Sequence, residues 1–116
     1  MDQDFVALQW VTGEIEQTSD QFGKALLGYA DDISDQTRLR LALTHAHQIH
    51  ATLRLLDIAS AVELAREVEE GVQAVLHGKI PGSELNLQVL LAAGLQLPGY
   101  LRRIANQHQE SPLDVL

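Results

Sequence analysis

The sequence predicts an all-α domain, an antiparallel up-and-down four-helix bundle. Apolar residues recur every three or four positions through four segments of similar length, which is the period of amphipathic helices. The connections between these segments are short, and short connections make consecutive helices antiparallel neighbours. With 116 residues and 46% hydrophobic content, the chain has room for one compact core. We therefore expect a bundle over residues 1–108, followed by a linker or tail over residues 109–116.

The first two helices are expected at residues 5–29 and 36–56. The apolar stripe of the first helix is Phe5, Leu8, Val11, Ile15, Phe22, Leu26 and Tyr29. The polar segment 31–35 interrupts this pattern, and Ser34 or Asp35 can cap the next helix by accepting hydrogen bonds from its free N–H groups. The apolar stripe of the second helix is Leu39, Leu43, Ala46, Ile49, Leu53 and Leu56.

The third and fourth helices are expected at residues 58–77 and 84–106. The third carries the stripe Ile58, Val62, Ala65, Val68, Val72 and Val75. Gly78 suits the left-handed position after a helix, Pro81 cannot continue one, and Ser83 can cap the next. The fourth carries the stripe Leu87, Leu90, Gly94, Leu97, Leu101 and Ile104.

The fourth predicted helix has two unusual features. Pro98 lies in its interior, where it removes the hydrogen bond to the carbonyl of Gly94 and crowds that carbonyl with its ring. Because glycine eases this crowding, we expect a kink and not a break. A second apolar line, Leu85, Leu91 and Leu95, indicates that the helix is central in the bundle or forms half of an interface.

The composition excludes several classes of protein. The chain has no cysteine, which removes disulfides, thiolate metal sites and cysteine nucleophiles and agrees with a reducing cytoplasm. A net charge of −8 argues against nucleic acid and anionic membranes as partners. The first residues are acidic, unlike a signal peptide, and no apolar run approaches the roughly 18 residues of a membrane span. We expect a cytoplasmic domain that is a piece of a longer chain.

The charge is distributed unevenly along the sequence. None of the 16 acidic residues lies between residues 36 and 56. The same segment holds three arginines and three histidines: Arg38, Arg40, Arg54, His45, His47 and His50. The second helix is therefore a cationic island in an acidic protein.

The second helix also holds the candidate site. His47 lies about 110° from the core direction of that helix, with Arg40 and Arg54 one double turn to either side. His50 lies one turn further along, close enough to share a ligand with His47. A neutral imidazole is a nucleophile near neutral pH, and flanking cations stabilise the oxygens of an acquired phosphoryl group. This pattern favours a phosphoacceptor at His47.

Two other interpretations of these residues stay open. Histidines and arginines on a helix surface are often only solvated side chains, and His47-x-x-His50 could chelate a metal ion. However, no third ligand is identifiable and the surrounding arginines oppose a cation, so we expect neither a metal nor another cofactor. The acidic residues of the third helix, Glu63, Glu67, Glu69 and Glu70, are expected to form a solvated face with an Arg66–Glu70 pair.

Four segments resemble a known family. Residues 46–53 (AHQIHATL) and 63–69 (ELAREVE) resemble the histidine phosphotransfer (Hpt) domain. Residues 6–15 (VALQWVTGEI) and 95–101 (LQLPGYL) resemble the N-terminal domain of the CheA-like hybrid chemosensory kinases that control type IV pili and twitching motility. The resemblance covers nearly the whole chain. It implies a four-helix Hpt fold and a place in a two-component phosphorelay.

The resemblance assigns a role to each matched position. His47 corresponds to the phosphorylated histidine and Ile49 to the apolar position of the motif. His50 stands where the family has a lysine that neutralises the phosphoryl group, and Ala51 stands where it has a glycine that leaves room for the partner. Arg40, His50 and Arg54 would then support the phosphoryl group by charge.

The resemblance also implies the partners, which are a kinase catalytic domain and a response-regulator receiver domain. An Hpt domain has no catalytic activity alone, because those partners supply the metal ion and most of the charge stabilisation. The sequence leaves one alternative, a degenerate Hpt-like scaffold that docks proteins of the same pathway and transfers nothing. The oligomeric state is left open.

Overall fold

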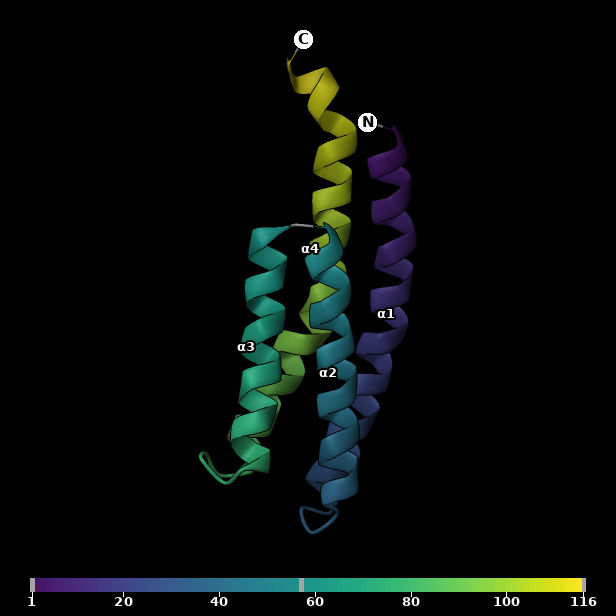
Figure 1. Ribbon diagram of the computed structural model, residues 1–116. Coiled ribbons are helices and arrows are strands. Elements are labelled where there is room, and N and C mark those ends of the chain that lie inside the picture. The colour runs from purple at the N-terminus through teal and green to yellow at the C-terminus, as the bar shows by residue number, and fades with distance from the viewer. Residues whose placement is uncertain (1, 57, 116) are drawn as a thin grey trace.

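The computed structural model describes residues 2–56 and 58–115, with side chains described for residues 9–56 and 58–104. It contains four helices, α1 (Asp2–Asp31), α2 (Gln36–Leu56), α3 (Ala59–Leu76) and α4 (Glu84–Val115), and no strand in the described residues. Successive helices run in opposite directions (Figure 1). α1 and α3 each pack against both α2 and α4, so the four helices form a ring in cross-section. The predicted antiparallel bundle is confirmed.

The first and last helices, α1 and α4, are longer than the second and third, α2 and α3. α1 has 30 residues and α4 has 32, whereas α2 has 21 and α3 has 18. In Figure 1, α1 and α4 continue past the ends of α2 and α3 on the side where both termini lie. The molecule is consequently elongated, at 55 × 19 × 19 Å.

The predicted end of the fourth helix near residue 106 is wrong, because α4 continues to Val115. The polar stretch 106–110 has no glycine, and its glutamine and glutamate residues favour helix, so polarity alone does not stop it. The division into a bundle and a tail at residue 109 stays a prediction. Phe5, Leu8 and His108 lie outside the described side chains.

The core has two parts stacked along the bundle axis. The part near the α1–α2 turn contains buried side chains from all four helices: Phe22, Ala25, Leu26, Tyr29, Leu39, Ala42, Ala46, Val68, Val72, Val75, Leu87 and Leu90. The part near the α2–α3 turn contains Val11, Ile15, Ile49, Leu53, Ala61, Ala65, Leu97 and Leu101. No helix in the described part of the chain is long and apolar enough to cross a bilayer.

The predicted caps of the α3–α4 connection are present. Gly78 has a φ of +74°, the left-handed conformation that follows a helix end, and the N–H of Lys79 donates to the carbonyl of Ala74 at 2.8 Å. At the start of α4, the Ser83 hydroxyl accepts a hydrogen bond from the N–H of Asn86 at 3.2 Å.

α4 passes through Pro98 without interruption. Figure 1 shows the green part of α4 inclined relative to its yellow part, in agreement with the predicted bend. The carbonyl of Gly94, which Pro98 leaves without its helical donor, accepts a hydrogen bond of 2.9 Å from the buried hydroxyl of Ser19 on α1. A Cβ at Gly94 would overlap the ring of Phe22, at 2.8 Å from its Cδ2. Glycine at this position therefore lets α1 approach the bend closely.

Candidate functional site

The second helix presents His47 at its middle, on the side that faces solvent next to α3. Its side chain is 68% exposed, whereas that of His50 is only 15% exposed. The two residues are three apart and thus share one side of the helix. Because buried Ala46 and Ile49 fix the inward side of α2, His50 falls at the edge of the core and His47 outside it. His50 is therefore the more buried of the two histidines.

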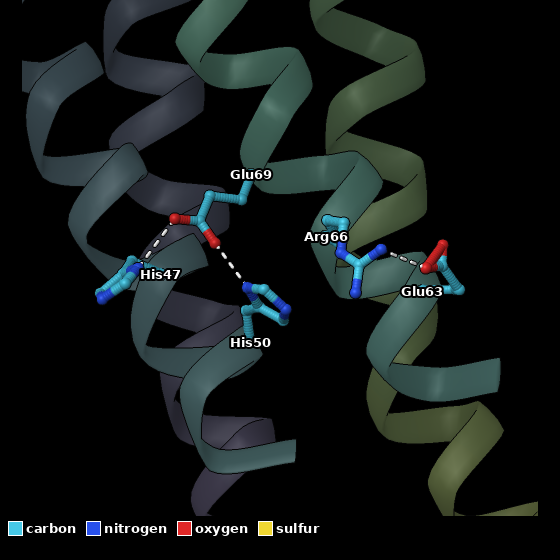
Figure 2. A network of polar contacts seen from close by, with 5 residues as sticks. All are labelled: His47, His50, Glu63, Arg66 and Glu69. Carbon is cyan, nitrogen blue, oxygen red and sulfur yellow. Dashed lines mark hydrogen bonds and ion pairs between the residues drawn. The ribbon is translucent and has the colours of Figure 1, made fainter. Parts of the chain in front are cut away.

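Both histidines bind the same carboxylate, that of Glu69 on α3 (Figure 2). The Nδ1 of His47 lies 2.8 Å from Oε2 of Glu69, and the Nδ1 of His50 lies 2.8 Å from Oε1. The Glu69 side chain is only 12% exposed. It directly follows Val68, which is buried, so the helix period places Glu69 at the border of the core and beside α2. One carboxylate therefore joins two imidazoles across the α2–α3 interface.

The charge of Glu69 fixes how the imidazoles are protonated. Burial acts to raise the pKa of Glu69, but the hydrogen bonds from His47 and His50 outweigh it and hold this pKa below its ordinary value. An ionised carboxylate only accepts hydrogen bonds, so each Nδ1 must carry a proton and donate it. Nε2 is then the second nitrogen of each ring, and in a neutral ring it carries the lone pair.

The two Nε2 atoms are in different surroundings. Figure 2 shows the His47 ring with its second nitrogen turned away from Glu69, on a side chain that is mostly exposed. The Nε2 of His50 is buried and has no hydrogen-bond partner among the described residues. Of the two histidines, therefore, only His47 offers a nucleophilic nitrogen to another molecule.

The other predicted site residues do not join this contact. Arg40 and Arg54 are exposed on α2, and each is seven residues, or about 10 Å along the helix axis, from His47. Ala51 is exposed one turn beyond His47, where its methyl group borders the approach to the ring. The structure therefore brings His47 and His50 together, and it leaves the two arginines to act on His47 only through their electric field.

The predicted solvated acidic face of α3 is wrong for Glu69. Glu63, Glu67 and Glu70 are exposed, but Glu69 is largely buried and faces α2. The predicted Arg66–Glu70 pair is also wrong, since Arg66 Nη1 binds Glu63 Oε1 at 2.5 Å instead. The position of Glu69 directly after a core valine was not a sufficient signal, because Arg66 directly follows the core residue Ala65 and is exposed.

The described residues around His47 do not form a metal site. Across the described side chains, no group of three or more histidine, cysteine, aspartate or glutamate residues is arranged to hold a metal ion. The Nδ1 atoms of His47 and His50 are both taken by Glu69.

Comparison with known family models, curated proteins and solved structures found no match.

Proposed function

We propose that this domain is a histidine phosphotransfer module in a two-component phosphorelay, with His47 as the phosphoacceptor. The observation that supports this most directly is the state of the His47 ring. Its Nδ1–H is held by a nearly buried carboxylate while the rest of the ring is exposed at the middle of a helix. A phosphodonor has to reach the nucleophile in line, and an exposed, oriented Nε2 meets that requirement.

The chemistry assigned to this ring is one reversible substitution at phosphorus. The lone pair on Nε2 of neutral His47 attacks the phosphorus of a phosphodonor, either ATP held by a kinase domain or an aspartyl phosphate of a receiver domain. The N–P bond forms as the bond from phosphorus to the donor oxygen breaks, and that oxygen keeps the electron pair. The ring becomes positively charged, and the Glu69 carboxylate on Nδ1–H stabilises this charge. Transfer to a receiver aspartate runs the same step in reverse.

The carboxylate has two further effects on the site. It holds the ring in one tautomer and one orientation, which removes the cost of arranging the ring during the reaction. It also places a negative charge near the incoming phosphoryl oxygens, and this charge repels them. The positive charges of Arg40 and Arg54 offset this repulsion from a distance. Because His50 binds the same carboxylate, it competes for part of that negative charge.

The setting of the module is proposed from the sequence resemblance. It indicates the CheA-like hybrid kinase of the type IV pilus system, with a kinase catalytic domain and a receiver domain as cytoplasmic partners. Thr44 and Ala51 are exposed one turn to either side of His47. Their small side chains leave room for a partner domain over the middle of α2.

A phosphorylation assay tests the proposal. The domain is incubated with a histidine-kinase core and ATP, or with receiver domains already phosphorylated, and a histidine-linked, acid-labile phosphoryl group is sought by mass spectrometry. His47→Gln keeps shape and polarity but removes the nucleophile, so it should abolish labelling. His45→Gln is the matched control on the same helix and should leave labelling unchanged. A wild-type domain that stays unlabelled and yet binds a receiver would show that it is a docking scaffold.

The same assay tests the role of Glu69. Each carboxylate oxygen of Glu69 accepts from one ring, and in Glu69→Gln one of these oxygens is replaced by an NH2 group, which cannot accept from the Nδ1–H that faces it. A charge-assisted hydrogen bond is worth about 1.5–3 kcal/mol, so labelling should slow by about 10- to 100-fold. Glu67→Gln, one of the exposed acids of α3, should label like the wild type. A labelling rate unchanged by Glu69→Gln would contradict this role.

A further inference from the structure

Several large apolar side chains are exposed on α1, on α4 and in the turn after α1. Leu27 at the end of α1 is 52% exposed, and Ile33 in the following turn is 59% exposed. On α4, Leu85, Val89 and Leu95 are exposed as well. Residues 85–101 of α4 include no charged side chain at all. Leu27 and Ile33 line one cavity together with Leu91 of α4, and exposed apolar side chains gathered around a cavity mark an interaction site more often than a plain solvated face.

A cavity opens on this surface near the α1–α2 turn. It has a volume of about 370 Å³ and lies between the end of α1 and the start of α4. Leu26, Leu87 and Leu91 form its apolar floor, and Leu27 and Ile33 form one wall. This volume admits a large aliphatic or aromatic side chain. The cavity belongs to the α1–α4 pair, whereas His47 lies at the α2–α3 interface, so the two sites are separate.

The rim of the cavity is acidic. Asp31 and Glu84 line it, and none of the described lining residues is basic. Asp31 is in the last turn of α1, a turn without a basic residue, where a carboxylate opposes the helix dipole and lowers the stability of the helix. The cavity thus combines apolar lining with two carboxylates, which complements a partner that carries positive charge.

We propose that this cavity binds an amphipathic segment of a partner protein, with a bulky apolar side chain in the cavity and lysine or arginine residues against Asp31 and Glu84. Apolar anchors with flanking charges are the usual means by which a groove between helices recognises such a segment. A second copy of this chain fits less well. It would bring another net charge of −8, and in a symmetric contact it would place the same two carboxylates opposite each other.

The test uses synthetic helical peptides of about 14 residues as probes. One carries leucines at spacings of three and four with lysines beside them, the second has glutamates in place of the lysines, and the third keeps the lysines but replaces the leucines by alanines. Each is titrated into labelled protein while amide signals are followed by NMR. The leucine–lysine peptide should bind and shift Leu27, Ile33 and Leu91 first. The other two should bind at least about tenfold more weakly.

Two variants locate the binding surface. Leu27→Glu places a charge at the cavity wall and should weaken the leucine–lysine peptide by about tenfold or more. Leu55→Glu is the matched control, since Leu55 is 86% exposed on α2 and away from the cavity. It should leave binding unchanged. Circular dichroism checks that both variants keep the fold.

A charge reversal tests the acidic rim. In the double variant Asp31→Lys and Glu84→Lys, preference should change to the leucine–glutamate peptide. The proposal fails if neither peptide binds, if the glutamate peptide binds the wild type equally well, or if the shifts centre on another surface. It also fails if sedimentation shows a dimer that Leu27→Glu dissociates, since the occupant would then be a second copy. Phosphorylation of His47 enters none of these measurements.

Discussion

A single acidic residue, Glu69, gives the candidate site its chemical form. A carboxylate at the border of a core loses hydration, and this loss is tolerated only when hydrogen bonds replace the water. Glu69 receives one from each of two histidines, on one oxygen apiece. In return it fixes the protons of both rings on Nδ1, so that the exposed nitrogen of His47 is Nε2. The same two hydrogen bonds therefore stabilise Glu69 in the fold and make Nε2 the available nucleophilic nitrogen of His47.

The lowered pKa of Glu69 predicts how its contribution to stability depends on pH. A folded-state pKa below the unfolded value means that the unfolded chain binds more protons, so stability rises with pH in this range. The contribution is complete above the ordinary glutamate pKa of about 4.3 and is lost as pH falls through the lower folded-state value. Glu69→Gln cannot titrate. Urea unfolding from about pH 3 to pH 5.5 should therefore show wild type losing stability relative to this variant toward low pH. Parallel curves would contradict the assignment.

Among the helices, α4 shows how a neighbouring element corrects a local defect. Pro98 deprives the carbonyl of Gly94 of its helical hydrogen bond, and this carbonyl is at the buried side of the bundle. Ser19, 1% exposed on α1, supplies the missing donor. The bend in α4 and the close approach of α1 are thus parts of one arrangement.

A double-mutant cycle tests this arrangement. Ser19→Ala alone leaves the Gly94 carbonyl buried without a donor and should reduce the free energy of unfolding by about 1–3 kcal/mol. Pro98→Ala restores a backbone N–H at residue 98, which can donate to that carbonyl. In the Pro98→Ala background, Ser19→Ala should therefore cost clearly less, a difference measured by urea unfolding of the four proteins. Additive effects would show that Ser19 stabilises the fold in another way.

The elements were more predictable from sequence than the site. α2 was predicted from Gln36 to Leu56 and has these bounds, because apolar periodicity and turn residues are local properties of the chain. The end of α4 was predicted wrongly, because polar residues that also favour helix do not mark where a helix ends. Glu69 was missed because its burial depends on how α2 and α3 align, and that alignment arises only when the bundle packs. The exposed position of His47 at the middle of α2 could be predicted because the helix period is visible within one segment, while its role as phosphoacceptor stays a prediction.

Two interhelical polar contacts, one between α1 and α4 and the other between α2 and α3, lie near the level where the two parts of the core meet. On α1 and α4 this level holds Ser19 and Gly94, which separate the residues of one core part from those of the other. On α2 and α3 it holds His47, His50 and Glu69. The buried side chains above and below this level consequently position the candidate site from both ends.

The core should respond strongly to truncation, because it consists largely of aliphatic side chains in close contact. Leu53 and Leu97 are fully buried in the part of the core near the α2–α3 turn. Replacing either by alanine should lower the free energy of unfolding by about 2–5 kcal/mol. Leu55→Ala, at a mostly exposed position on α2, should change it by less than about 0.5 kcal/mol. Equal losses for Leu53 and Leu55 would contradict the burial assigned to them.

The charge distribution of the whole molecule predicts where an anion binds. The net charge is −8, yet α2 contains no acidic residue and presents Arg40 and Arg54 on either side of His47. The average field repels anions, so only a local concentration of positive charge can hold one. Sulfate or phosphate added to isotope-labelled protein should shift the signals of Arg40, His47 and Arg54 first, with a smaller response from His50, because it is largely buried on Glu69. Added sodium chloride should weaken these shifts through screening. Shifts centred on Lys79, in the α3–α4 connection, would show that the positive side of α2 has no special affinity for a phosphoryl-like anion.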